Sequence, residues 1–450
     1  MATFDFSEKL PFGEMFLVRS SEIEGRIDPL YYQTIHNFIF AKQKKYTVSK
    51  MVDCIDMQRG RFGHRPRNDP KLYGGDYPFI QTGDIVKASQ NAGKITYSQT
   101  LNELGLKTSR LQTEKAVILT IAANIGDTAI LDYPACYPDS LIALTPKSDD
   151  LRLEYINIYF KFIKSFLEDL APQAAQKNIN YQQLAPVPIV IPPLAVQDEI
   201  IRIYENALLA RNSKQKQAQT LLTSINDYLL GELGITLPET DNSLNSRIFT
   251  VQMSEVGGGA FDPFTQFNKH YRIEGGKYPN ERLDNIAFLQ KGQSITSDDI
   301  VSGDYPVIAG GQSSPYSHNV CNHKGNVITV SASGAYSGYV WYHDYSIFAS
   351  DCTVIFSKDE NKLITEFLAE VLKVKQQEIY LLQKGAGQPH VYPNDLAKLN
   401  IPLPDKPTQQ KIIAHIQAIK AQATALQAEA EQLLSQAKAE IEQMILGGAQ

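Results

Sequence analysis

Residues 178–200 read NINYQQLAPVPIVIPPLAVQDEI, and residues 390–412 read HVYPNDLAKLNIPLPDKPTQQKI. Sliding the chain along itself by 212 positions aligns the two stretches without a gap. The alignment pairs identical or closely similar residues: Gln176 with Gln388, Leu184 with Leu396, Ile189 with Ile401, Ile191 with Leu403, Pro192 with Pro404, Gln197 with Gln409 and Ile200 with Ile412. The chain therefore carries one sequence plan twice.

Earlier parts of the two halves also correspond, at offsets that change with loop length. The matching stretches are RIDPLYY from Arg26 with AFDPFTQ from Ala260, GGDYPFIQTGDI from Gly74 with SGDYPVIAGGQS from Ser302, and AVILTIAANIGDTAIL from Ala116 with NVITVSASGAYSGYVW from Asn326. Both halves contain short β-branched and aromatic runs separated by Gly, Pro, Asn and Asp, which predict short strands and tight turns. Helices are predicted at matching places, near residues 151–170 and 359–380. Each half is thus predicted to be an α+β unit.

After each proline-rich stretch the apolar period changes from two residues to three and a half. The apolar positions of the second half are Ile412, Ile416, Ile419, Ala423, Leu426, Ala430, Leu433 and Ala437. Their equivalents in the first half are Ile200, Tyr204, Ala207, Arg211, Lys214, Ala218, Leu221, Ile225 and Tyr228, so two cations interrupt that stripe. Alternating steps of four and three predict a coiled-coil seam. Because one narrow stripe cannot be buried alone, the two long helices are predicted to pair with each other, antiparallel.

The predicted organisation follows from these patterns. The first globular unit covers residues 1–190, a long helix covers 191–235, the second globular unit covers 236–402, and a second long helix covers 403–450. The two halves are related by a pseudo-two-fold repeat. A chain of 450 residues with 43% hydrophobic and 20% charged residues has an ordinary globular composition that supports several cores.

Composition also excludes several classes of protein. The four cysteines lie far apart without a CxxC pair, so neither a disulfide framework nor a zinc finger is expected. No signal pattern opens the chain, and its most apolar run is too short to span a membrane, so we expect a cytoplasmic protein. The net charge is −6, yet residues 41–75 hold nine Lys or Arg against three Asp. This local basic excess favours a nucleic-acid contact in an otherwise acidic chain.

The doubled QKNINYQQLAPVPIVIPPLAVQDEI type of segment, each copy entering a long helix, and GDYPFIQTGDI in the first unit together resemble the specificity subunit of type I restriction-modification systems. The resemblance covers nearly the whole chain. It implies two target recognition domains that each read one half of a bipartite, asymmetric sequence in double-stranded DNA. It also implies that the helices set the unread spacer and bind two methyltransferase subunits, through which the restriction and translocase subunits join.

No catalytic motif accompanies these features. The stretch IPPL at Ile191 lacks the polar and aromatic ends of an (N/D)PP(Y/F) loop, VGGGAF at Val256 does not fit a cofactor loop between a strand and a helix, and no Walker A sequence occurs. The sequence CNH at residues 321–323 has no further ligands nearby, and a turn between strands is the simpler interpretation. We therefore expect a non-enzymatic chain without a cofactor or a metal ion.

Residues suited to reading base edges or binding phosphate concentrate in loops. The candidates are Arg59, Arg61, His64, Arg65, Arg67, Gln81, Thr82, Lys177 and Asn178 in the first half, and Gln312, Ser331, Ser333, Tyr336, Lys384, Gln388 and His390 in the second. A structural role in a turn explains the presence of Gln81 and Thr82 as well as a contact with DNA bases does. The loops before each proline-rich strand could either bind phosphate or fix the helix to its unit. The Arg-rich loop has no strict counterpart around LQKGQSITSDD in the second half.

Two alternative functions stay open at this point. A coiled-coil scaffold whose globular ends bind proteins or glycans would suit the mild acidity and the aromatic content, but it does not account for the Arg-rich loop. A fused restriction enzyme, which reads and cuts within one chain, is disfavoured because it needs the catalytic motifs that were not found.

Overall fold

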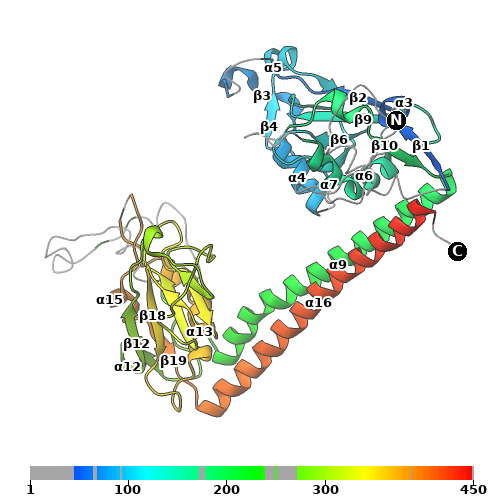
Figure 1. Cartoon of the computed structure of the whole chain (residues 1–450). Helices are drawn as coiled ribbons and strands as arrows, with labels where there is room; N and C mark the ends of the chain where they lie inside the picture. Colours follow the sequence, from blue (N-terminus) through cyan, green and yellow to red (C-terminus); the bar gives the residue numbers. More distant parts are fainter. Residues whose placement is uncertain are drawn as a thin grey trace, which may run out of the picture. The chain divides into compact units, whose positions relative to one another are not determined.

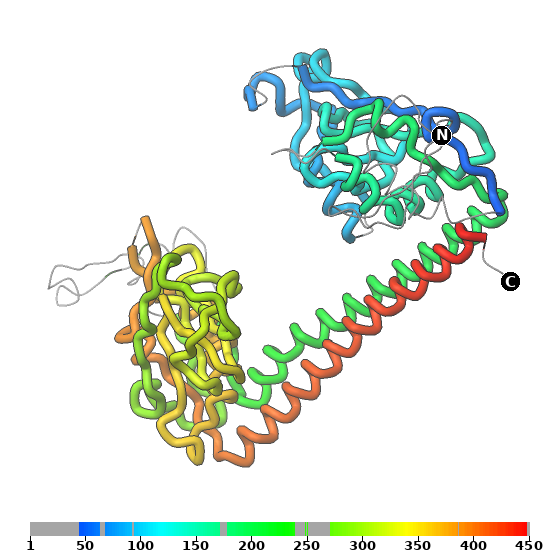
Figure 2. The backbone as a smooth tube through the Cα atoms, viewed as in Figure 1, coloured from blue at the N-terminus to red at the C-terminus, as the bar shows by residue number. Residues whose placement is uncertain are grey.

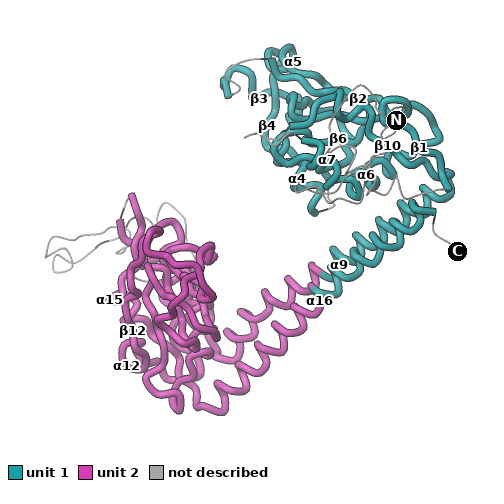
Figure 3. The backbone as a smooth tube through the Cα atoms, in the orientation of Figure 1, with its two compact units in different colours: residues 1–214, 428–450 teal, residues 215–427 magenta. Residues whose placement is uncertain are grey.

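The computed structural model describes residues 45–63, 68–91, 94–171, 178–238, 248, 250, 271–385 and 387–447. The chain divides into two compact units: unit 1 comprises Met1–Lys214 and Ala428–Gln450, and unit 2 comprises Gln215–Gln427 (Figure 3). Each unit joins a globular part to a portion of both long helices, α9 (Leu194–Leu233) and α16 (Lys406–Leu446). The predicted fold class, two similar mixed α/β halves with two long antiparallel helices, is confirmed.

A four-stranded antiparallel sheet forms the centre of unit 1 (Figure 1). Its strand order is β2 (Ile55–Arg59), β9 (Leu141–Pro146), β6 (Ala116–Thr120) and β7 (Thr128–Leu131). Every residue of β6 is buried. Val117 and Leu119 belong to one core cluster, whereas Ala116 and Ile118 belong to another. Successive side chains of a strand point to opposite faces, so the unbroken apolar run AVILT reflects a strand that is covered on both faces.

Helices and a smaller sheet provide that cover in unit 1. Helices α6 (Leu153–Phe162) and α7 (Lys164–Leu170) contribute to the first cluster, and α4 (Thr82–Asn91) contributes to the second. The smaller sheet has the order β4 (Gln99–Leu101), β3 (Tyr73–Phe79), β8 (Ala135–Cys136) and β5 (Leu111–Gln112). Short helical segments connect these strands: α3 (Met51–Cys54), η2 (Pro70–Leu72), α5 (Glu103–Thr108) and α8 (Tyr181–Leu184).

Unit 2 repeats this plan. Its antiparallel sheet has the order β12 (Ala287–Lys291), β18 (Cys352–Ser357), β15 (Val327–Ser331) and β16 (Val340–His343). The smaller sheet is β14 (Ser317–His318), β13 (Tyr305–Ile308) and β17 (Phe348–Ala349). Its helical segments are α12 (Leu283–Ile286), η3 (Ser297–Asp299), α13 (Thr365–Val374), α14 (Gln376–Tyr380) and α15 (Pro393–Leu396). Helices α6 and α13 keep the same 212-residue offset as the sequence repeat, whereas a loop at residues 309–316 replaces α4.

A two-stranded ladder leads from each globular part into its long helix. In unit 1, β1 (Thr47–Lys50) pairs antiparallel with β10 (Pro188–Ile191), as the backbone trace shows (Figure 2). In unit 2, β11 (Asn280–Arg282) pairs antiparallel with β19 (Asn400–Pro402). The proline-rich stretches of the repeat are therefore the strands that close each unit, and the prolines after them begin the change of direction into the helix.

The two repeated glutamines fasten each helix to its unit in the same way. Gln197 is 0% exposed; its side chain donates to the carbonyls of Asp150 and Pro192 and accepts from Arg152 N, each at 2.8 Å. Gln409 is also 0% exposed; it donates to the corresponding carbonyls at 2.7 and 2.9 Å and accepts from a backbone N–H at 2.8 Å. Each buried amide thus provides hydrogen-bond partners for backbone N–H and C=O groups of loops, which have no partner within a strand or a helix.

Within each unit, α9 and α16 lie side by side. In unit 1, Ile200 and Tyr204 share the core with Ile441 and Ile445. The two cations of the first stripe are satisfied across the pair, by Arg211 with Glu431 at 3.2 Å and Lys214 with Glu429 at 2.9 Å. Glutamates of α16 therefore neutralise both cations of the α9 stripe within the helix pair.

In unit 2, apolar residues of the two helices join the core of the globular part. They are Ile225, Leu229 and Leu233 from α9 and Ile412, Ile416 and Ile419 from α16. Ala218 and Ala423 of this unit are fully buried, as is Ala430 of unit 1, whereas Leu221 and Leu426 of this unit and Leu433 of unit 1 are only half-buried. Small residues at the most buried positions allow the two backbones to approach closely.

Candidate nucleic-acid interface

Two arginines flank a glycine at the end of β2. The side chains of Arg59 and Arg61 are exposed, whereas Phe62 is 3% exposed and packs among the aromatic rings of the smaller sheet. A Cβ atom at Gly60 would lie 2.1 Å from the carbonyl oxygen of Pro138, so only glycine fits here. The buried ring and the glycine together hold this backbone in place while both guanidinium groups face solvent.

The loop of residues 136–141 anchors the arginine pair. The Nε atom of Arg59 donates to the carbonyl of Asp139 at 2.8 Å, and the backbone N–H of Arg61 donates to the carbonyl of Tyr137 at 3.1 Å. A third arginine joins them, since Nη1 of Arg110 donates to the carbonyl of Arg59 at 2.6 Å. The sequence did not point to Arg110, because it lies 51 residues away and its own segment carries no repeat or basic run.

Gln81 and Thr82 lie beside the same loop. The hydroxyl groups of Thr82 and Ser140 are 3.1 Å apart, and Gln81 Nε2 donates to Gln99 Oε1 at 2.6 Å. These residues line an open cavity of about 450 Å³ whose wall also contains the ring of Phe79. Among the described residues, the remaining Oε1 of Gln81 and Nε2 of Gln99 make no hydrogen bond. The pair therefore presents one acceptor and one donor next to an aromatic wall.

Asn178 and His390 occupy equivalent places in the two units. Asn178 forms a backbone bridge with Ala122, and His390 forms the same kind of bridge with Ser333. Both residues immediately precede the strand and helix that leave the unit. Asn178 is exposed and His390 is half-buried, with its ring stacked on that of Tyr392 at 6.0 Å. The structure thus brings these two candidates to matching positions above the end of the central sheet.

Several candidates of unit 2 gather around the β15–β16 turn. Ser333 bonds to the carboxylate of Asp351, Tyr336 is exposed, and Gln388 is exposed in the facing loop. Gln312, in the loop after β13, is exposed.

Ser331 and Lys384 have internal partners. Ser331 is 4% exposed and its hydroxyl lies 3.5 Å from the carbonyls of Ala309 and Gly311, so this structure directs the hydroxyl toward the protein interior. Lys384 Nζ donates to the carboxylate of Asp395 at 2.6 Å. Burial alone would raise the pKa of Asp395, but the hydrogen bonds from the two lysines Lys384 and Lys398 hold that pKa below its ordinary value. Between the two roles considered for this loop, the ion pair favours fixing the helix junction.

The Arg-rich loop does have a counterpart in unit 2, contrary to the sequence-based expectation. Strands β2 and β12 show the same pattern of buried and exposed residues, and each ends in a cation followed by glycine. A Cβ atom at Gly292 would lie 2.0 Å from Ser350 O, as at Gly60. The segment from Gln58 to Arg61, QRGR, is therefore equivalent to QKGQ from Gln290 to Gln293. The glutamine, the first cation and the glycine are retained, whereas the second cation, Arg61, is replaced by Gln293.

Four predicted contact residues, His64, Arg65, Arg67 and Lys177, lie outside the described residues. Within the part of the chain that the structure describes, no cluster of His, Cys, Asp and Glu side chains is placed to hold a metal ion. In the same part, no helix is both long and apolar enough to cross a membrane. His323 of the CNH sequence instead forms a backbone bridge with Ile347 between strands.

Known proteins share the sequence pattern and the fold of this chain. Two segments, residues 39–223 and 277–436, match the type I restriction modification DNA specificity domain. Three solved structures are similar over 90% of this chain: the type I restriction-modification S subunit from M. genitalium (14% identity, 98% of that chain, TM-score 0.46), a chain from a study of assembly and conformational transition of the type I R-M system (13%, 97%, 0.54), and the HsdS subunit from Thermoanaerobacter tengcongensis (14%, 97%, 0.38).

Two matches to a DNA specificity domain, on two α+β units that share one backbone frame, define a DNA specificity protein. The matched segments cover most of the sequence, and the chain belongs to the family of type I restriction-modification DNA specificity subunits. It is the non-catalytic specificity component of such a system. Membership of this family argues against both alternative functions, the coiled-coil scaffold and the single-chain restriction enzyme.

Proposed function

We propose that each unit reads one half of a bipartite, asymmetric sequence in double-stranded DNA, and that the residues after β2 and β12 lie at the centre of the two reading surfaces. One observation carries this proposal. The same backbone frame presents Arg59 and Arg61 in unit 1 but Lys291 and Gln293 in unit 2, and all four side chains are exposed. Two equivalent frames with different polar groups suit two different half-sites.

The chemistry of these groups supports unlike base preferences. Arginine binds the O6 and N7 atoms of guanine with two hydrogen bonds, whereas a glutamine amide suits the N6 and N7 atoms of adenine. Unit 1 therefore offers two guanine-reading groups where unit 2 offers one ammonium and one amide. The amide pair Gln81 and Gln99 adds an acceptor and a donor beside the arginines, and the loop carrying Gln388 and His390 adds polar groups in unit 2.

The paired helices are proposed to set the unread spacer between the half-sites. Helices of 40 and 41 residues with buried alanines and three cross-helix ion pairs resist bending and sliding, as a spacer-setting element must. We further propose that two methyltransferase subunits bind the exposed faces of α9 and α16, and that restriction and translocase subunits join through them. The assembled complex would act in the cytoplasm, where its DNA substrate lies.

The test exchanges the two reading groups between the units. The chain is co-expressed with the methyltransferase gene expected beside it, and methylated adenines are mapped on the host genome by long-read sequencing. The double variant R59K/R61Q should change bases in one half of the gapped motif only, and K291R/Q293R should change bases in the other half only. A motif that stays the same in both variants would contradict the assignment of these four residues.

A matched control separates base reading from loss of charge. Lys147 follows the far end of β9, about 20 Å from the 136–141 loop for a strand of this length. Its replacement in K147Q removes one positive charge and should leave the methylated motif unchanged. Replacing Arg61 by Gln alone should also reduce the salt dependence of DNA affinity by about one counterion if the side chain contacts phosphate, whereas a base contact should alter the motif at constant slope.

A further inference from the structure

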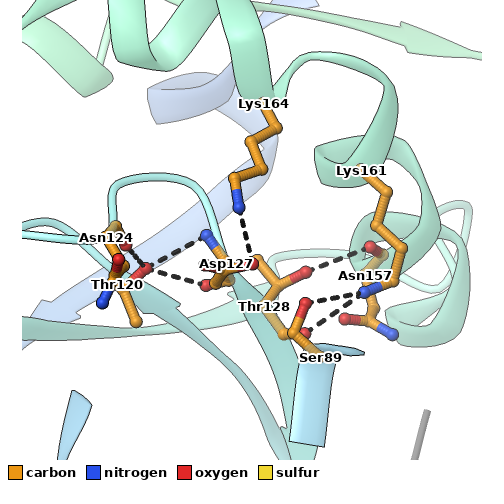
Figure 4. Close-up of polar contacts among 8 residues, drawn as sticks. All are labelled: Ser89, Thr120, Asn124, Asp127, Thr128, Asn157, Lys161 and Lys164. Atoms are coloured by element: carbon orange, nitrogen blue, oxygen red, sulfur yellow. Dashed lines mark hydrogen bonds and ion pairs between the residues drawn. The ribbon is translucent and has the colours of Figure 1, made fainter. Parts of the chain in front are cut away.

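One lysine of unit 1 is half-buried and has no carboxylate partner among the described residues. Lys161, on α6, donates from Nζ to Ser89 Oγ at 3.2 Å and to the carbonyl oxygen of Thr128 at 3.4 Å (Figure 4). The nearby carboxylate of Asp127 is bonded to Lys164 at 2.8 Å instead. Among the described residues, Lys161 takes part in no ion pair. An ammonium group in this position has only neutral acceptors to replace its lost hydration.

The pKa of Lys161 also reflects the absence of a carboxylate partner. Burial lowers the pKa of Lys161 to about 8, the carboxylate of Asp127 acts against this shift, and the ammonium groups of Lys438 and Lys164 add to it. A carboxylate beside Nζ would favour the charged amine and return the pKa toward its ordinary value.

The internal repeat supplies a comparison for this lysine. At the 212-residue offset, Lys161 corresponds to Lys373 of unit 2. Lys373 Nζ lies 2.9 Å from the carboxylate of Glu370, which is 4% exposed and also accepts from Lys420 on α16 at 2.7 Å. The positions of Glu370 and Lys420 are taken by Ile158 and Leu208 in unit 1. Unit 1 has thus kept one cation of the group and lacks its carboxylate.

The space of the missing groups is an open cavity of about 380 Å³. Ile158, Lys161 and Leu208 all line it, as does Asn157. Asn157 Oδ1 is buried and has no hydrogen-bond partner in the structure. The cavity is therefore lined by a lysine that has no ion-pair partner among the described residues, and the Asn157 amide oxygen is buried behind its wall. Its volume lies in the range of pockets that bind small molecules.

We propose that this cavity binds a small organic acid, such as a hydroxy acid or an amino acid, with its carboxylate on Lys161 Nζ. The other lysines of the wall are already paired, Lys94 with Asp132 at 3.4 Å and Lys115 with Glu154 at 2.6 Å. Lys161 is therefore the lysine of the wall that has no ion pair among the described residues, and it shares the wall with the carboxylate of Glu205. This site is separate from DNA reading and does not depend on it.

The experiment follows the reactivity of Lys161 in the full chain. An acylating reagent is added in trace amount at pH 7, and the labelling rate of each lysine is measured by mass spectrometry with L-lactate, L-alanine or buffer alone. Only the unprotonated amine reacts, so a bound carboxylate that restores the pKa should slow the labelling of Lys161 by on the order of tenfold or more. The labelling of Lys147, an exposed lysine outside the cavity, should not change.

Two variants test the geometry. Ile158→Glu supplies the carboxylate that unit 2 has at this position, so labelling of Lys161 should be slow without ligand and insensitive to lactate or alanine. Lys161→Gln, which keeps the length of the side chain, should abolish the heat of binding of lactate and alanine in calorimetry even if Ile158→Glu does not fold. A glutamine variant that still binds either acid would overturn the proposal. So would protection of Lys161 by a co-expressed methyltransferase but by neither acid, because the carboxylate would then come from a protein partner.

Discussion

Replacing Gln409 by leucine tests how firmly the long helix is fastened to unit 2. The side chain is completely buried, and it makes three hydrogen bonds that join the start of α16 to the loop before α13. Leucine has a similar size but cannot form any of them. The two carbonyl oxygens of Lys362 and Pro404 and the backbone N–H of Ile364 would lose these contacts within a closed joint.

The expected cost follows from the number of bonds. A buried hydrogen bond contributes about 1 kcal/mol net, so three lost bonds should reduce the free energy of unfolding of unit 2 by about 3 kcal/mol. For a unit of roughly 200 residues, this corresponds to a Tm lower by about 6–12 °C. The burial of leucine does not offset the loss, because the backbone groups around it stay polar.

Differential scanning calorimetry of the full chain measures this effect. The transition assigned to unit 2 should move while that of unit 1 stays, and Gln197→Leu should produce the reverse pattern. Gln410→Leu is the matched control, because the neighbouring side chain is exposed and its replacement should change stability by less than about 0.5 kcal/mol. If Gln409→Leu melts like the control, the amide is not what fastens the helix.

Three further changes have definite expected outcomes. In unit 2, Ile416→Asp should lower the Tm more than Leu426→Asp, because Ile416 is fully buried and Leu426 only half-buried. Burial lowers the pKa of His343 from 6.5 to about 4. The stability that depends on neutral His343 is therefore complete above pH 6.5, and up to about 3 kcal/mol of it is lost as the pH falls to 4. Denaturant titrations at several pH values should show this decrease in the free energy of unfolding, and His343→Gln should make it smaller. Gly60→Ala should reduce DNA affinity and stability, because the added methyl group would lie 2.1 Å from a backbone carbonyl oxygen; Gly83→Ala, where nothing lies within 4 Å, should leave both unchanged in filter binding and thermal melting.

Much of the fold could be predicted because its signals are local and doubled. The gapless repeat identified the closing strands, and the change of period identified two helices that need each other. The burial of individual seam positions could not be predicted as well. A heptad pattern treats leucine and alanine alike, yet Ala430 is more buried than Leu433 because the closeness of the two backbones depends on packing that the period alone does not show.

The candidate interface was only partly predictable for a different reason. Basic and amide residues can be recognised in a loop, but their neighbours come from distant segments, as Arg110 and Gln99 show. Ser331 looked like a contact residue because serine suits phosphate, but its strand position turns the hydroxyl inward. Lys291 and Gln293 could not be assigned to the interface from the short QKGQ match alone, because their equivalence to Arg59 and Arg61 rests on a glycine that packs against a backbone carbonyl in both units.

The ladders that close the two units also bear on how such a protein can change over generations. Among the described residues, the globular part of unit 1 begins with β1 and ends with β10, and these strands are hydrogen-bonded neighbours. The ends of everything between them therefore lie about 5 Å apart, which is the spacing of paired strands. An exchange of genetic material with both crossovers inside these two short strands would import a complete foreign domain and inherit the helices untouched. A single exchange of this kind could give the protein a new DNA sequence preference. No intermediate protein with a disrupted fold would be needed.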